Sequence, residues 1–301
     1  DESTLYAARD PQGIRPLVLG RLERGWVVAS ETAALDIVGA SYIREIEPGE
    51  LIAVDEHGLR SRRFAEAAPK GCLFEFVYLA RPDTIISNQR VHSVRVEIGR
   101  RLAKSFPADA DLVIPVPESG TPAAIGYAEA SAIPMRMGLI RNHYVGRTFI
   151  EPQQSIRHFG VRVKLNPVRS ILDGQRVVLI DDSIVRGTTS RKIVRMVRGA
   201  GAREVHMRIS CPPTIAPCFY GVDTPRRSEL IAATHTLEEI RKYLSADTVA
   251  YLSLEGLKGA VKGGQSKYCT SCYTGVYPVA FPRDEAAYLQ LALKLNPEPL
   301  K

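Results

Sequence analysis

The pattern of apolar and polar positions changes near residue 72. Before that point, short apolar runs alternate with turn sequences such as Asp10-Pro-Gln-Gly and His57-Gly, which predicts a β-rich block with one short helix at 33–38. After it, short apolar runs alternate with longer amphipathic ones. We expect helices at 91–106, 121–132 and 189–199, and strands at 112–115, 177–180 and 205–209. This alternation predicts an α/β unit with a mostly parallel sheet.

Residues 177–189 carry the clearest chemical signal. They read Val-Val-Leu-Ile-Asp-Asp-Ser-Ile-Val-Arg-Gly-Thr-Thr, a buried strand that ends in two carboxylates and leads through a loop into a helix. The helix N-terminus offers unpaired N–H groups to an anion, and Gly187 lets the backbone approach a phosphate closely. Asp181 and Asp182 suit a ribose diol or Mg²⁺. The alternative is a polar turn, but burying two carboxylates is costly without a ligand.

Two further segments suggest contacts with an anion. Residues 114–121, Ile-Pro-Val-Pro-Glu-Ser-Gly-Thr, again join a strand to a helix; the alternative, a proline-rich connector, has equal weight. Residues 141–165 are polar and basic and fit no single element. They are typical either of a solvated loop or of a lid that closes over an anionic substrate.

The five cysteines include one close pair, Cys269-Thr-Ser-Cys272. That spacing fits Zn²⁺, an iron–sulfur cluster or a redox dithiol, and a four-sulfur site needs two more thiolates. The residues alone leave the metal open. We interpret Cys211 as a core residue. An odd number of cysteines without an export signal is unlike a disulfide framework.

Composition narrows the class of protein further. The chain has 301 residues, 45% of them hydrophobic and 24% charged, with a formal net charge of +7. No apolar run reaches the roughly 18 residues of a membrane span, and the start has no signal-peptide pattern. The basic residues are spread out without interleaved aromatic residues. We therefore expect a cytoplasmic protein with no membrane or nucleic-acid partner.

The segment 181–189 resembles the phosphoribosylpyrophosphate (PRPP) loop of type I phosphoribosyltransferases, in the variant found in the iron–sulfur class of glutamine PRPP amidotransferases (amidophosphoribosyltransferases). Residues 8–20 and 30–40 resemble the second half of that family's glutaminase domain, which has the N-terminal-nucleophile fold. The resemblance implies a partial glutaminase domain at 1–71, a type I phosphoribosyltransferase domain at 72–275 and a C-terminal helical tail at 276–301.

The resemblance also implies roles for individual residues. Arg147 and Lys164, in the family's catalytic loop, would neutralise the departing pyrophosphate. Mg²⁺ would be held by Ser119, Asp181 and Asp182, and a [4Fe–4S] cluster, with Zn²⁺ as the alternative, by Cys72, Cys218, Cys269 and Cys272. PRPP would be bound by Glu118, Ser119, Gly120, Asp181, Asp182, Ser183, Ile184, Val185, Arg186, Gly187, Thr188 and Thr189. The sequence departs from the family at Glu118, where Asp is common, and at His143, where Arg is usual.

The reaction implied is the conversion of PRPP and glutamine-derived ammonia to 5-phosphoribosylamine and pyrophosphate in purine synthesis. The family's glutaminase nucleophile is an N-terminal cysteine, whereas residue 1 here is Asp. We therefore expect the PRPP and ammonia half-reaction without glutaminase activity, and a glutaminase remnant with an exposed strand edge and apolar surface. The family is homo-oligomeric, a tetramer, and purine nucleotides are its expected feedback inhibitors. Two alternatives remain: a salvage phosphoribosyltransferase, and a non-catalytic PRPP-binding or regulatory module.

Overall fold

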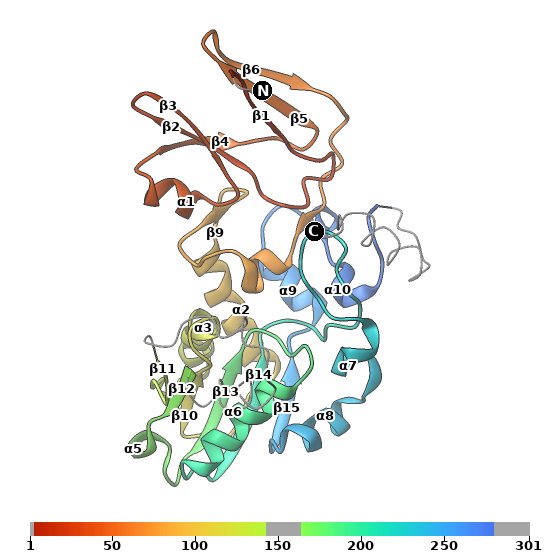
Figure 1. Cartoon of the computed structure of the whole chain (residues 1–301). Helices are drawn as coiled ribbons and strands as arrows, with labels where there is room; N and C mark the ends of the chain where they lie inside the picture. Colours follow the sequence, from red (N-terminus) through yellow and green to blue (C-terminus); the bar gives the residue numbers. More distant parts are fainter. Residues whose placement is uncertain (1–2, 143–163, 280–301) are drawn as a thin grey trace, which may run out of the picture.

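The computed structural model describes residues 3–142 and 164–279, which form a β-rich N-terminal block and an α/β unit (Figure 1). The block contains two three-stranded antiparallel sheets, ordered β1-β5-β6 and β3-β2-β4, and one helix. Its elements are β1 (Leu5–Ala8), β2 (Val18–Leu22), β3 (Gly25–Ala29), α1 (Thr32–Ile37), β4 (Ser41–Glu45), β5 (Glu50–Asp55) and β6 (Gly58–Arg63).

The N-terminal block leaves much apolar surface in contact with solvent. Its two small cores are centred on Leu35 and on Ile52. The exposed large apolar side chains are Leu5, Tyr6, Ile37, Val38, Tyr42, Ile43 and Phe64, with Ile37 74% exposed. Strand β1 is an edge of its sheet. The expected exposed edge and apolar surface are therefore both present.

The α/β unit is built on one parallel sheet, ordered β10-β13-β14-β15. These strands are Leu112–Pro115, Arg176–Asp181, Glu204–Ile209 and Thr248–Tyr251, and β13 is buried along almost its whole length, as a strand covered on both faces must be. The helices are α2 (Val91–Ser105), α3 (Thr121–Ser131), α5 (Arg169–Leu172), α6 (Thr188–Gly199), α7 (Ile231–Thr234), α8 (Leu237–Leu244), α9 (Leu254–Ala260) and α10 (Ser271–Thr274).

Shorter elements complete the unit. They are β7 (Gly71–Cys72), the π-helix η1 (Glu75–Leu79), β8 (Ile85–Ile86), β9 (Gln89–Arg90), β11 (Leu139–Arg141), β12 (Leu165–Pro167), the 3₁₀ turns η3 (Arg227–Glu229) and η4 (Gln265–Lys267), and β16 (Tyr268–Cys269). No helix among residues 3–142 and 164–279 is long and apolar enough to cross a membrane.

Helices α2 and α3 lie in very close contact because each has a glycine where the two backbones meet. A Cβ on Gly99 would lie 1.9 Å from the carbonyl oxygen of Ala123, and one on Gly126 would lie 1.8 Å from that of Val96. No side chain fits at those separations. The two glycines therefore fix the spacing between α2 and α3. The turn at 118–120 leads directly into α3.

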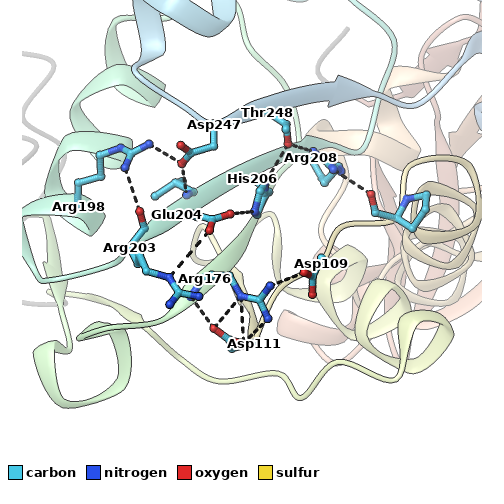
Figure 2. Close-up of polar contacts among 12 residues, drawn as sticks. Asp109, Asp111, Arg176, Arg198, Arg203, Glu204, His206, Arg208, Asp247 and Thr248 are labelled. Atoms are coloured by element: carbon cyan, nitrogen blue, oxygen red, sulfur yellow. Dashed lines mark hydrogen bonds and ion pairs between the residues drawn. The ribbon is translucent and has the colours of Figure 1, made fainter.

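A polar network covers the N-terminal edge of the parallel sheet (Figure 2). Arg176 donates to Asp111 at 2.8 Å, and hydrogen bonds from Arg176 lower the pKa of that carboxyl to about 2. The ring of His206 lies between Thr248 and Glu204, at 3.1 Å from each. Arg208 is 4% exposed and donates to backbone carbonyls. At this end of the sheet the charged and polar side chains are therefore paired with one another or with backbone carbonyls.

The two parts of the chain meet around β7. Strand β7 pairs in parallel with β16, so that Cys72 and Cys269 are register partners, and the amide of Cys72 donates to the carbonyl of Ile14. Across the same junction, Arg15 lies 3.0 Å from the buried carboxylate of Glu75. The domain boundary expected between residues 71 and 72 stays a prediction, and most of the helical tail expected at 276–301 lies outside the described residues.

Candidate functional site

A cavity of about 620 Å³ opens at the carboxyl end of β13. In a parallel α/β sheet this edge is where ligands bind, because loops and helix N-termini converge there. Much of its lining comes from three segments: the carboxylate pair with the loop that follows it, the turn before α3, and the segment 72–79 that includes η1. The residues from the first two are Asp181, Asp182, Ser183, Val185, Arg186, Gly187, Thr188, Thr189, Ser190, Val116 and Ser119.

Asp181 and Asp182 are buried, at 7% and 6% exposed. The Ser183 hydroxyl donates to Asp182 at 2.5 Å, and the Asp182 amide donates to Asp181 at 2.9 Å. Burial raises the pKa of both carboxyls; the charge of Asp182 adds to the rise at Asp181, and the hydroxyls of Ser119 and Ser183 oppose it at Asp182. Among the described residues neither carboxylate forms an ion pair. Two buried acidic groups that form no ion pair with a described residue suit a divalent cation or a diol.

The loop after these carboxylates turns back through Gly187 into α6. Gly187 has φ +74°, and a Cβ there would lie 2.8 Å from the side chain of Ile231. Thr188 and Thr189 line the cavity at the first turn of α6, where backbone N–H groups lack helical partners. Of the predicted loop residues, Ile184 is 1% exposed and packs into the core.

The turn before α3 approaches β13 through Gly120. A Cβ on Gly120 would lie 2.5 Å from the Ile180 carbonyl oxygen. This close approach brings the Ser119 hydroxyl to the carboxylate of Asp182. Glu118, by contrast, has a side chain that is 62% exposed, lies 3.7 Å from Arg141 and is not part of the cavity wall. Only Ser119 of the predicted residues 118–120 therefore lines the cavity.

Of the two residues expected in the catalytic loop, Arg147 and Lys164, the structure describes only Lys164. Arg147 lies outside the described residues, as does most of the segment 141–165. Lys164 is partly buried, and its carbonyl accepts a hydrogen bond of 2.8 Å from Asn142. Lys164 is thus fixed beside the pair β11–β12, and it is absent from the cavity lining.

Three of the four predicted cysteine ligands line the cavity. Cys72, Cys218 and Cys272 line it, and Cys272 lies within electrostatic reach of the other three thiols. Burial, followed by the charge of Glu75, raises the pKa of Cys72 to about 12. No three His, Cys, Asp or Glu side chains of residues 3–142 and 164–279 are spaced to hold a metal ion. Four thiols are suitable donors for a four-sulfur metal site, but the distances between these side chains are not those of a formed site.

The fifth cysteine behaves differently. Cys211 is fully buried in the main hydrophobic core, and its thiol lies 3.2 Å from the carbonyl oxygen of Pro212. This placement confirms its interpretation as a core residue.

Sequence reasoning missed the remaining walls of the cavity. Phe74, Tyr78 and Leu79 come from η1 and the residue before it, and Thr214 and the segment 221–224 close the opposite side. An apolar run such as Leu73-Phe-Glu-Phe-Val-Tyr-Leu carries no ligand-binding pattern. These residues reach the site through tertiary packing.

Comparison with known proteins gives a consistent result. No protein-family model matches the chain. Amidophosphoribosyltransferase of Mycobacterium tuberculosis is 59% identical over 291 residues, which cover 95% of this chain and 55% of that protein. The Bacillus subtilis protein of the same name is 50% identical over 94% of this chain and 60% of its own length. The chain thus spans somewhat more than half the length of these curated relatives.

Solved structures agree with the sequence comparison. The structure of glutamine PRPP amidotransferase from B. subtilis complexed with ADP and GMP superposes with a TM-score of 0.86 at 49% identity, covering 94% of this chain and 63% of that one. A second structure, described as the allosteric regulatory enzyme of purine biosynthesis, gives a TM-score of 0.87. The expected α/β fold with a preceding partial domain is confirmed.

Proposed function

We propose, on the premise that the chain is homologous to amidophosphoribosyltransferases over 95% of its length, that it carries out the PRPP and ammonia half of their reaction. The products would be 5-phosphoribosylamine and pyrophosphate, in purine synthesis. The observation that carries the proposal is that Asp181, Asp182, Ser119 and the loop 183–189 before α6 line the same cavity.

Each part of this wall matches one part of PRPP. The 5′-phosphate would bind to residues 183–189, where Gly187 lets the backbone approach it closely. The hydroxyls of Thr188 and Thr189 would donate to it beside the unpaired amides at the start of α6. The carboxylates of Asp181 and Asp182 accept hydrogen bonds from the ribose hydroxyls. Ammonia is already a good nucleophile, so the chain's task is to position PRPP, stabilise leaving-group charge and exclude water.

Two inorganic groups belong to this proposal. Ser119, Asp181 and Asp182 would hold Mg²⁺, which would neutralise charge on the pyrophosphate. Cys72, Cys218, Cys269 and Cys272 would hold a [4Fe–4S] cluster in a structural role, with Zn²⁺ as the alternative occupant. The four thiols come from segments far apart in the sequence. Such a group would therefore join β7, where the N-terminal block meets the α/β unit, to the segments around Cys218 and Cys269–Cys272.

The basic residues of the segment 141–165 complete the proposed chemistry. Arg147 and Lys164 would neutralise the charge of the departing pyrophosphate. We also propose that the chain acts in the cytoplasm as a homo-oligomer, and that purine nucleotides inhibit it by placing their phosphate in the loop that binds PRPP. ADP and GMP are the nucleotides named with the B. subtilis structure.

The deciding experiment measures PRPP consumption and pyrophosphate release by the 301-residue chain with Mg²⁺. Ammonia and glutamine are supplied separately, and adenine, guanine and uracil serve as competing acceptors. We expect turnover with ammonia and none with glutamine. Turnover with a nucleobase would instead establish a salvage enzyme. PRPP binding without any turnover would establish a non-catalytic module.

A further inference from the structure

Arg95 is a buried cation whose side chain is held by backbone rather than by a carboxylate. It lies on α2, is 4% exposed, and forms no ion pair among the described residues. Its Nε donates to the carbonyl of Phe76 at 2.9 Å, and its Nη2 donates to those of Glu75 and Ala80 at 3.2 and 2.7 Å. Burying a guanidinium without a carboxylate partner is costly, so its position calls for a specific reason.

The three carbonyls lie in and just after η1. The last carbonyls of a helix have no partner within it. Of the three carbonyls here, that of Glu75 also accepts the amide of Ala80 at 3.2 Å. Arg95 supplies donors for them from a different helix. Since η1 presents Tyr78 and Leu79 to the cavity while Phe76 packs into the core, Arg95 fixes the position of this cavity wall.

Arg95 is not itself part of the cavity lining. It stands behind the wall and acts on it through the three carbonyls that it binds.

We propose that Arg95 is a positioning residue for the phosphoribosyl site, which holds η1 in place as a wall of the cavity. This role rests on the proposed function, because it assumes that PRPP is the ligand of the cavity. Arg95 would contact neither PRPP nor the reacting atoms.

Arg208 provides a matched control. It is also 4% exposed, and its guanidinium also donates to three backbone carbonyls: those of Phe106, Met207 and Pro107, at 2.9, 3.1 and 3.1 Å. Its guanidinium reaches the start of β15, where it donates to Thr248 in the network of Figure 2, and Arg208 is not part of the cavity lining. Replacing either arginine removes the same kind of interaction, but only one is next to a cavity wall.

The experiment compares Arg95→Met and Arg95→Lys with Arg208→Met and Arg208→Lys. PRPP binding in the presence of Mg²⁺ is measured by calorimetry well below each melting temperature, and hydrogen exchange is followed in residues 73–80. We expect Arg95→Met to weaken PRPP binding at least about tenfold, with faster exchange in 73–80, because a displaced wall misplaces the ligand. Arg95→Lys keeps the charge but not the three bonds, so its loss should be smaller.

The control variants should show lowered melting temperatures, PRPP binding within about twofold of wild type and unchanged exchange in 73–80. PRPP binding within twofold of wild type in both Arg95 variants would overturn the positioning role alone. An equal loss of binding in the Arg208 variants would also overturn it, because the effect would then be one of general stability. If Arg95→Met does not fold, Arg95→Lys decides. A wild-type chain that fails to bind PRPP overturns the proposed function, and the positioning role with it.

Discussion

Replacing Gly120 by alanine should reduce activity far more than its chemical size suggests. The added Cβ would lie 2.5 Å from the carbonyl oxygen of Ile180 and 3.0 Å from that of Val116. The Ile180 carbonyl already accepts the Val116 amide at 2.8 Å, so it is held within the sheet and cannot move away freely. The turn at 118–120 must therefore move instead.

The size of this movement follows from ordinary contact distances. Carbon and carbonyl oxygen rarely approach closer than about 3.3 Å, so the turn must shift by roughly 1 Å. Ser119 would move with it, away from Asp182. A misplacement of about 1 Å at a reacting centre costs on the order of 100-fold in rate, or about 2.7 kcal/mol of transition-state stabilisation.

The assay is kcat/KM for PRPP with saturating ammonia and Mg²⁺, together with the melting temperature. Gly199→Ala is the matched control, because a Cβ at Gly199 meets nothing within 4 Å and the residue ends α6. That variant should keep wild-type activity and be as stable or up to about 1 kcal/mol more stable. A folded Gly120→Ala protein with kcat/KM within threefold of wild type would refute the reasoning.

Three further changes have defined outcomes. Gly126→Ala should lower the free energy of unfolding by about 3 kcal/mol, measured in urea, because its Cβ would overlap the backbone of α2 at Val96. An arginine hydrogen bond lowers the pKa of Glu50 to about 2 from 4.5, so its stabilisation of about 2 kcal/mol is present above pH 4.5 and is lost as the pH falls toward 2. Glu50→Gln should remove that part of the acid dependence; an unchanged pH–stability curve would contradict the assignment. Anaerobically purified protein should show iron–sulfur absorbance that Cys272→Ser abolishes and Cys211→Ser retains; zinc alone in metal analysis would exclude the iron–sulfur cluster.

The regular elements of the α/β unit could be predicted closely from local pattern. The strand expected at 177–180 is β13, and the helix expected to end at Gly199 is α6, because a buried parallel strand and an amphipathic helix each have a distinctive periodicity. The shortest elements were not foreseen. The run Glu75-Phe-Val-Tyr-Leu of η1 could equally belong to a strand, and the donors that its carbonyls accept from Arg95 come from another helix.

The candidate site shows the same division. Asp181, Asp182 and the loop 183–189 could be recognised because adjacent carboxylates followed by Gly, Ser and Thr are residue types that bind a phosphorylated sugar. Which side chains of the loop face the cavity could not be read from sequence, since Ile184 turns into the core while its neighbour Val185 lines the cavity. Tyr78 and Thr214 reach the cavity only once distant segments have packed, and no local signal marks them.

The pairing of β7 with β16 has a consequence in time. Next to this pair, the Lys70 side chain bonds to the carbonyl of Ser266, a partner 196 residues further along the chain. At roughly 5–20 residues per second, a ribosome needs about 10–40 s to make the intervening segment. During that interval only Cys218 of the three other predicted ligands is made, because Cys269 and Cys272 follow Ser266 in the sequence. Loading of the proposed cluster would therefore follow synthesis of Cys269 and Cys272, and β7 can pair with β16 only after that segment has been made.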